Sequence, residues 1–151
     1  MTLYYHGTKD TLEWMQKAKP EPTEKDLTTQ IGVHVEEIGE MLETLTSADG
    51  RVGYLLTKTQ SYLEELSIAL KETNQSIIIK DRIEFLDSLA DQIVTAVGVG
   101  HCAGMKIVDA LNEVNRSNFS KFDSNGTPIL DNNRKIMKGP DYSKPDLSKF
   151  V

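Results

Sequence analysis

The sequence predicts an all-α protein, a bundle of four or five helices with a small C-terminal hairpin and an extended arm. Apolar residues recur at helical spacing in several long segments, and proline or glycine clusters separate those segments. Strand signals are confined to the C-terminal tail. Because 151 residues suit one core, we expect a single domain, with the bundle over about 9–122 and the hairpin and arm over about 123–151.

The first two helices are expected on either side of a proline-containing link. A short helix covers about 9–18 and ends at KPEPT, whose prolines break it. Thr23 then offers an N-cap for the second helix, with Asp26 as its acidic partner. An apolar stripe continues that helix over about five turns. It consists of Leu27, Ile31, Val35, Ile38, Leu42 and Leu45. The glycines of SADGRVG end it.

Three further helices are expected over about 54–72, 80–102 and 106–122. The fourth has no Asp, Glu, Lys or Arg from Gln92 to Met105, so we expect this half to be buried in the bundle centre or in a subunit interface. Its glycines would permit close backbone approach, and Cys102 is expected to be an inert buried thiol. A homodimer or homotetramer is therefore expected. After these helices, TPIL and KIM are predicted to pair as a hairpin across 131–134.

Composition limits the classes of function. The net charge of −6 argues against a nucleic-acid partner, because no basic face is left to neutralise phosphates. The single cysteine excludes a disulfide framework or a cysteine metal site. Neither a signal peptide nor a membrane-spanning apolar run is evident, so we expect a cytoplasmic location and no membrane partner.

Two clusters of carboxylates stand on separate predicted helices. The first consists of Glu36, Glu37 and Glu40, and the second of Glu84, Asp87 and Asp91. The members of each cluster share one side of their helix. Facing each other across a bundle, they would form the all-oxygen site that hard divalent cations need.

A simpler reading of each cluster stays open. The first lies nearly opposite the apolar stripe, as a solvated face would, and the second could be a partly exposed acidic edge. No histidine completes either cluster, which favours Mg²⁺ or Mn²⁺ over zinc. His34 and His101 are expected to be hydrogen-bonded core or interface residues.

Four segments occur in a characteristic order. They are QIGVHVEEIGEML, LDSLADQIVTAVGVGHCAGM, ALNEVNRSNFSKFD and KIMKGPDYSKPDL. Together they resemble the MazG-like branch of the all-α nucleoside triphosphate pyrophosphohydrolases, related to phosphoribosyl-ATP pyrophosphohydrolase, in its short phage or bacterial form. The resemblance spans about 30–147. It implies a nucleoside triphosphate substrate, Mg²⁺ (with Mn²⁺ as a substitute), and cleavage between the α and β phosphates to give a nucleoside monophosphate and pyrophosphate.

The resemblance also implies roles for the acidic residues. The first family motif falls on the glutamates of the first cluster, so Glu37 and Glu40 are expected to bind metal. Either Glu36 or Glu37 is expected to act as the base that takes a proton from water. In the second motif Ser88 stands where the family has glutamate. We therefore expect Asp87 and Asp91 as ligands, with Glu84 as a third or supporting group, and an alternative alignment places the motif on Glu84 and Asp87.

Substrate contacts are expected from later segments. Asn115, Asn118 and Lys121 share a helical face. The resemblance implies that Asn118 lies near the sugar or base, and Lys121 suits phosphates as a point charge. Further candidates are Arg116, Lys138, Tyr142 and Gln30. Two other functions stay open: a non-enzymatic helical interaction module with solvated acidic faces, and the same fold acting on another substrate such as phosphoribosyl-ATP.

Overall fold

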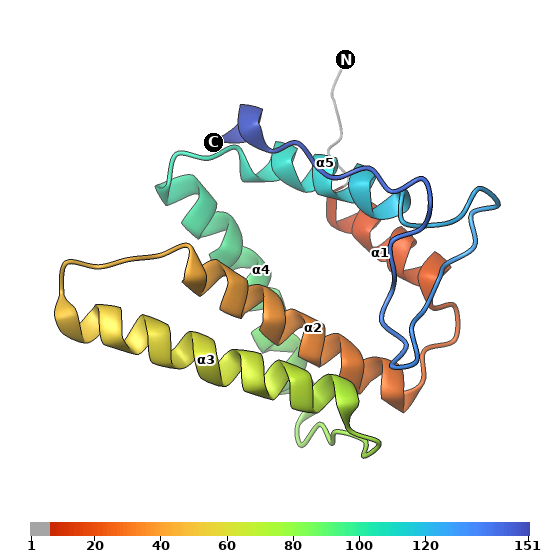
Figure 1. Cartoon of the computed structure of the whole chain (residues 1–151), viewed down its shortest axis with the longest axis horizontal. Helices are drawn as coiled ribbons and strands as arrows, with labels where there is room; N and C mark the ends of the chain where they lie inside the picture. Colours follow the sequence, from red (N-terminus) through yellow and green to blue (C-terminus); the bar gives the residue numbers. More distant parts are fainter. Residues whose placement is uncertain (1–6) are drawn as a thin grey trace. The chain divides into compact units, whose positions relative to one another are not determined.

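The computed structural model describes residues 7–151 and confirms the all-α class (Figure 1). Its elements are α1 (Gly7–Ala18), α2 (Glu24–Glu43), α3 (Gly50–Glu72), α4 (Arg82–Cys102), α5 (Ile107–Phe119) and the 3-10 helix η1 (Ser148–Phe150). The chain divides into two compact units. Unit 1 runs to Pro20 and continues over Ile78–Ile129 and Ile136–Val151, and unit 2 comprises Glu21–Ile77 and Leu130–Lys135.

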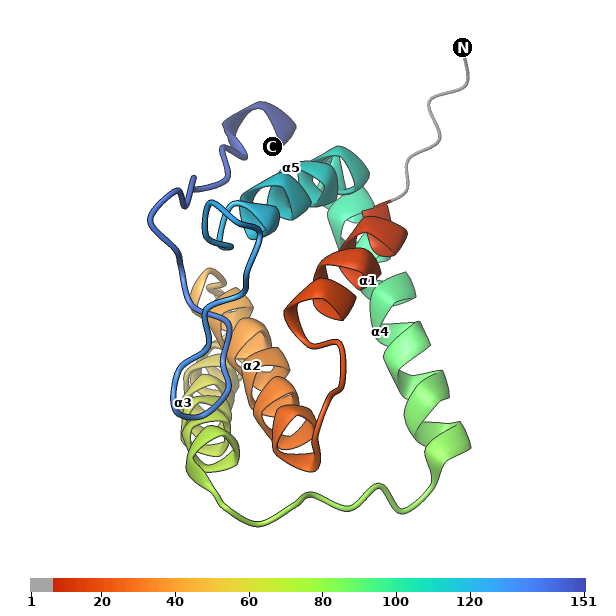
Figure 2. The same ribbon diagram turned by 90° about the vertical axis from the view of Figure 1, so that its right-hand side faces the viewer.

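Unit 2 is built on α2 and α3, which pack side by side in both ribbon views (Figures 1 and 2). Gly32 and Gly39 are seven residues apart and so lie on the same face of α2. A Cβ on Gly32 would lie 3.0 Å from Lys71 Cγ and 3.1 Å from the Ser67 carbonyl oxygen. The helices therefore approach closely at this glycine. The predicted apolar stripe of α2 is half-buried up to Leu42, and Leu45 is exposed.

Local capping sets the ends of these helices. Thr23 caps α2, and the Asp26 carboxylate accepts a hydrogen bond from the Thr23 amide in return, so the predicted capping box is confirmed. The expected start of the third helix near residue 54 is wrong. Asp49 accepts hydrogen bonds from the Arg51 and Val52 amides, and α3 therefore begins at Gly50.

In unit 1, α1 packs against α5 around a small apolar core. Trp14, Ala18 and Phe122 are its buried members, and the Trp14 and Phe122 rings stack with centroids 6.3 Å apart. Asn115 is 3% exposed. Its Nδ2 donates to the Gly7 carbonyl at 2.7 Å. A buried amide thus fastens the start of α1 to α5.

The helix α4 belongs to unit 1 and meets α5 at one tight point. A Cβ on Gly100 would lie 2.7 Å from Ile107 Cβ, so the expected close backbone approach is confirmed there. No such approach occurs at Gly98 or Gly104, where an added Cβ would meet no other element of the described chain within 4 Å. Gly104 instead ends α4 with φ +75°.

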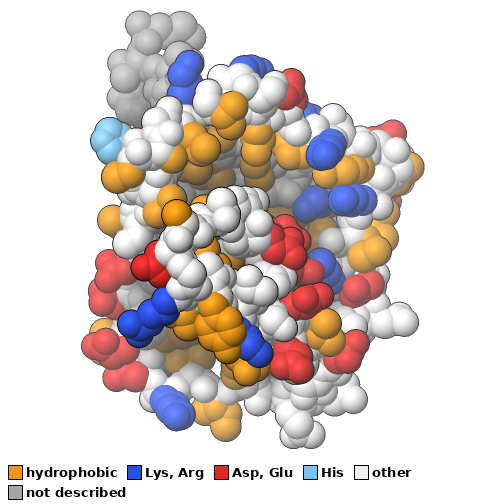
Figure 3. Space-filling model, turned by 60° about the vertical axis from the view of Figure 1, so that its left-hand side comes forward, with side chains coloured by type: hydrophobic (Ala, Val, Ile, Leu, Met, Phe, Trp, Pro, Cys, Tyr) orange, Lys and Arg blue, Asp and Glu red, His pale blue; other side chains and the backbone are white. Residues whose placement is uncertain are grey.

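Most of α4 is exposed in the single chain, so its uncharged half is not buried in a bundle centre, and the alternative of burial in a subunit interface stays a prediction. Gly100 is its one buried residue, and Val94 is 67% exposed. Cys102 is also exposed, so its assignment as a buried thiol is wrong. His34 and His101 are exposed as well. Local composition predicted burial, but α4 contacts α5 only near its C-terminal end, and nothing in unit 1 covers the rest. Apolar side chains are visible at the surface of the molecule (Figure 3).

The predicted pairing of the C-terminal hairpin is confirmed over a short stretch, because the Met137 amide donates to the Ile129 carbonyl at 2.7 Å. Leu130 and Ile136 are single bridge residues, and residues 7–151 contain no strand. The Asp131 amide donates a backbone hydrogen bond to the Lys135 carbonyl, with a donor–acceptor distance of 3.0 Å. Across residues 7–151, no single helix is both long and apolar enough to cross a membrane.

Candidate functional site

A cavity of about 250 Å³ lies between α2 and α3 in unit 2. Its lining residues are Glu36, Gly39, Glu40, Glu43, Gln60, Glu64, Ser67, Ile68 and Lys71. Two of the predicted glutamates, Glu36 and Glu40, thus point into a shared space. Glu37 is exposed and does not line it, because it lies about 100° further round the helix than Glu36. The first cluster is therefore split between a cleft and a solvent face.

Glu36 is held between two lysines. Lys71 Nζ lies 2.9 Å from Glu36 Oε1, and Lys135 Nζ lies 3.0 Å from Glu36 Oε2. Partial burial raises the pKa of this carboxyl, but the two lysines outweigh it and hold the pKa below its ordinary 4.5. The Glu36 side chain is therefore ionised at neutral pH, and both of its oxygens are engaged.

Two other oxygen groups of the cavity are available. Ser67 is 1% exposed, and its Oγ has no hydrogen-bond partner among the described residues. An unpaired buried hydroxyl costs roughly 1–3 kcal/mol, so a bound group that supplies a partner would relieve that cost. The Glu40 carboxylate accepts no hydrogen bond from residues 7–151 and lines the same cavity. Glu43, in contrast, accepts one from Gln60 at 2.9 Å.

These donors are of the kind that a hard cation takes, namely carboxylate and hydroxyl oxygens. They do not form a finished metal site, because no group of three or more acidic, histidine or cysteine residues with metal-binding geometry occurs within residues 7–151. The cavity thus offers part of a ligand set. Glu64, Ser67 and Lys71 were missed at the sequence level. The sequence carries one signal that could have identified Ser67: it is a serine between Leu63 and Leu70 on the otherwise apolar side of α3.

Lys135, which bonds Glu36, directly follows a tight turn near the C-terminus. The Asp131 carboxylate accepts hydrogen bonds from the Asn133 and Lys135 amides, both at 2.8 Å. Arg134 adopts a left-handed conformation with φ 64°, and its Nε donates to the buried Asp26 at 2.9 Å. Thr29 Oγ1 donates to the Asn133 carbonyl at 2.8 Å. The two residues before Lys135 are therefore both held to α2.

The second acidic cluster lies in unit 1. Glu84, Asp87 and Asp91 are all exposed on α4. Their carboxylates accept no hydrogen bond and form no ion pair with other residues of the described chain. Ser88, the residue that departs from the family motif, is exposed on the same helix. Three ionised carboxylates on one helical edge repel one another, and a cation would remove this cost.

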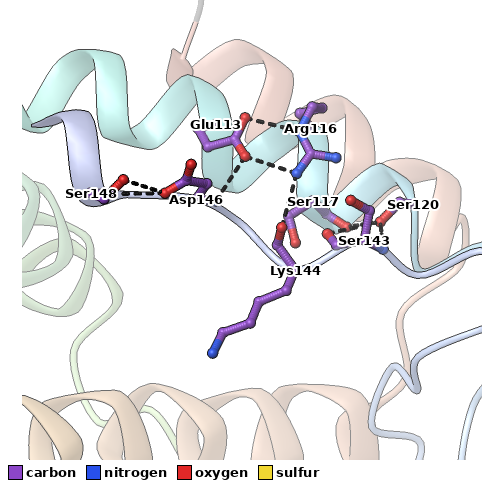
Figure 4. Close-up of polar contacts among 8 residues, drawn as sticks. All are labelled: Glu113, Arg116, Ser117, Ser120, Ser143, Lys144, Asp146 and Ser148. Atoms are coloured by element: carbon purple, nitrogen blue, oxygen red, sulfur yellow. Dashed lines mark hydrogen bonds and ion pairs between the residues drawn. The ribbon is translucent and has the colours of Figure 1, made fainter.

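The side chains of Asn115 and Arg116 both make hydrogen bonds within unit 1. Thr11 Oγ1 donates to Asn115 Oδ1 at 2.8 Å, so both ends of the buried amide are used to hold α1. Arg116 donates twice to Glu113 and once to the Lys144 carbonyl (Figure 4). The side chains of both residues are thus committed to packing and to the C-terminal arm.

The remaining substrate candidates are more accessible. Asn118 is half-buried on α5, and Gln30 is exposed on α2. Lys121 Nζ lies 5.4 Å from the Trp14 ring centroid, and Lys138 Nζ lies 4.8 Å from that of Tyr142. Each of these lysines therefore rests on an aromatic face. Lys121, Lys138 and Tyr142 all belong to unit 1.

Comparison with known proteins identifies no relative, since no family model, no curated protein and no solved structure matches the chain.

Proposed function

We propose that this protein is a Mg²⁺-dependent nucleoside triphosphate pyrophosphohydrolase that releases a nucleoside monophosphate and pyrophosphate. The observation that carries the proposal is the α2–α3 cavity, which gathers Glu36, Glu40 and the unpartnered Ser67 hydroxyl beside Lys71. It thus combines oxygen ligands for a cation with a positive charge for phosphate. The ordered motifs that resemble the MazG-like enzymes supply the reaction.

In unit 2, Glu40 is the residue of the cleft best suited to hold Mg²⁺, with Glu37 as a further candidate ligand. In unit 1, Asp87 and Asp91 are the candidate ligands, with Glu84 as a third or supporting group. When bound, the ion would neutralise phosphate charge and lower the pKa of a coordinated water. Either Glu36 or Glu37 is the carboxylate proposed to accept the proton from water. Water then attacks the α phosphorus, the bond to the bridging oxygen breaks, and that oxygen leaves as part of pyrophosphate.

Substrate recognition is assigned to Asn118 for the sugar or base and to Lys121 for phosphate, with Lys138, Tyr142 and Gln30 as further contacts. Lys121 and Lys138 already lie over aromatic rings, which restricts their side chains before a ligand arrives. A lysine that is ordered in advance loses less entropy on binding phosphate. Arg116 uses Nε and Nη2 for Glu113 and Lys144, and its Nη1 group stays a further candidate donor to phosphate.

We also propose that the protein is a cytoplasmic homodimer or homotetramer. The support is the exposed apolar surface of α4, where Ile83 is 81% exposed and Leu86 is 68% exposed. Surfaces of this kind mark interaction sites. The same observation favours the alternative function, a helical interaction module without catalysis. Size-exclusion chromatography with light scattering measures the assembly directly.

The test is Mg²⁺-dependent release of pyrophosphate from a panel of nucleoside triphosphates and phosphoribosyl-ATP. Glu40→Ala and Asp91→Ala should each abolish turnover and leave the helical circular dichroism unchanged. Glu65→Ala is the matched control, because Glu65 is an exposed glutamate of α3 outside the cavity, and it should stay active. The enzyme proposal fails if no nucleotide is hydrolysed and neither Mg²⁺ nor Mn²⁺ binds. The site assignment fails if both variants keep full activity.

A further inference from the structure

The strongest unassigned feature is the pair of lysines that binds Glu36 from both sides. The pair joins two distant segments, since Lys71 lies near the end of α3 and Lys135 follows the turn at 131–134. The Lys71 side chain is 16% exposed and that of Lys135 is 38% exposed. A half-buried carboxylate between two ammonium groups is a geometric substitute for a phosphate, because both present several oxygens to the same donors.

A second cavity adjoins this pair. It has a volume of about 270 Å³ and is lined by Ile68, Lys71, Glu72, Asp131, Asn133 and Lys135. Lys71 lines both this cavity and the one that contains Glu40. Pockets for drug-sized ligands measure roughly 300–1,000 Å³, so each space suits a small polar group. The Asp131 Oδ1 atom is already used by two backbone amides of the turn, whereas Glu72 adds a negative charge that an incoming anion must tolerate.

The turn holds Lys135 at the pair before any ligand arrives. The Arg134 contact with Asp26 and the Thr29 contact with the Asn133 carbonyl fix the backbone next to Lys135. Lys71 is fixed from the other side, because Lys25 Nζ donates to the Lys71 and Thr73 carbonyls, both at 2.7 Å. The backbone around both lysines is therefore held by hydrogen bonds that do not involve Glu36, whereas both Nζ atoms bond Glu36 itself.

We propose that Lys71 and Lys135 form a subsite for a phosphate or pyrophosphate anion, and that the Glu36 carboxylate occupies this subsite until the anion displaces it. The inference rests on the proposed function, which it deepens by naming the residues that receive the β and γ phosphates.

The test is calorimetric titration of inorganic pyrophosphate into the full-length protein without divalent metal. Lys71→Met and Lys135→Met should each weaken binding at least about tenfold, the loss expected for one charge-assisted hydrogen bond. Glu36→Gln should strengthen it by about tenfold, because the competing carboxylate charge is gone. Lys58→Met is the matched control, since Lys58 lies on α3 outside both cavities, and it should bind as the wild type does.

A variant with arginine at both positions guards against misfolding, because it keeps both charges and should retain pyrophosphate binding. The subsite is refuted if Glu36→Gln binds no more tightly than the wild type, or if the two lysine-to-methionine variants bind as the control does. Nucleotide turnover is measured on the same proteins. Pyrophosphate binding as expected without turnover would leave the subsite standing and reject the enzyme. Nucleotide turnover, together with pyrophosphate binding that the lysine substitutions leave unchanged, would support the enzyme and refute the subsite.

Discussion

Arg134 Nε lies 2.9 Å from Asp26 Oδ1, although the two residues are 108 positions apart in the chain. The Asp26 side chain is 2% exposed, and its other oxygen accepts hydrogen bonds from the Thr23 amide and hydroxyl. One buried carboxylate thus closes the N-terminal cap of α2 and anchors the turn that carries Lys135. The cap and the proposed anion subsite therefore depend on the same residue.

Asp26→Ala should lower the free energy of unfolding by roughly 2–3 kcal/mol, as measured by urea denaturation. The substitution removes the capping-box partner and leaves the Thr23 amide without its acceptor. It should also weaken pyrophosphate binding, because the turn before Lys135 loses its anchor. Thr23→Ser keeps the hydroxyl and serves as the control, with a change below about 0.5 kcal/mol. A stability loss no larger than that of the control would show that this carboxylate is dispensable.

Two glycines of α4 should respond in opposite ways to alanine. At Gly100 the new Cβ would lie 2.7 Å from Ile107 Cβ, so Gly100→Ala should destabilise the protein by about 1–3 kcal/mol through overpacking. Gly98 has open space around it, and Gly98→Ala should stabilise by up to about 1 kcal/mol through helix propensity. Urea denaturation of both variants at one protein concentration measures the difference. Equal effects would contradict the α4–α5 contact.

The C-terminal arm should be released by acid at an unusually low pH. Glu113 accepts hydrogen bonds from the Arg116 side chain and from the Asp146 amide, and these, with Arg116 the larger cause, lower the pKa of Glu113 to about 2. Because the folded pKa lies below the ordinary 4.5, the stabilisation is present above pH 4.5 and disappears as the pH falls through about 2.

Hydrogen exchange of the Asp146 amide, normalised to its intrinsic rate at each pH, measures this release. Protection should persist at pH 4 and disappear near pH 2 in the wild type. Glu113→Ala removes the acceptor of the Asp146 amide and should expose that amide at every pH. Glu13→Gln removes a comparable i,i+4 surface pair with Lys17 and should leave the arm unchanged. Loss of protection already near pH 4.5 would show that Glu113 titrates normally and does not hold the arm.

Features that depend on neighbours in the chain were predictable from sequence. The capping box at Thr23 and Asp26, the five helices and the break at KPEPT follow from short-range hydrogen bonding and from hydrophobic periodicity. The start of α3 was misjudged because glycines usually end helices, whereas the Asp49 cap overrides that tendency here.

The composition of the cleft was not predictable, because it depends on which side chains meet across two helices. Periodicity placed Glu36 and Glu40 opposite the apolar stripe, where a solvated face is the ordinary expectation. Gly32 permits close approach of α3 at that very face, and α3 then brings Ser67 and Lys71 to the glutamates.

The sequence by itself determined that this protein is helical, where most of its helices begin and end, and which carboxylates share a helical side. Each of these follows from interactions within a few residues. Only the tertiary structure brings Lys71 and Lys135 to the same carboxylate, that of Glu36. Lys135 lies 99 positions after Glu36 in the chain. A long-range ion pair leaves no local pattern in the sequence. This one forms because Asp131 and Asp26 fix the turn that places Lys135 beside α2.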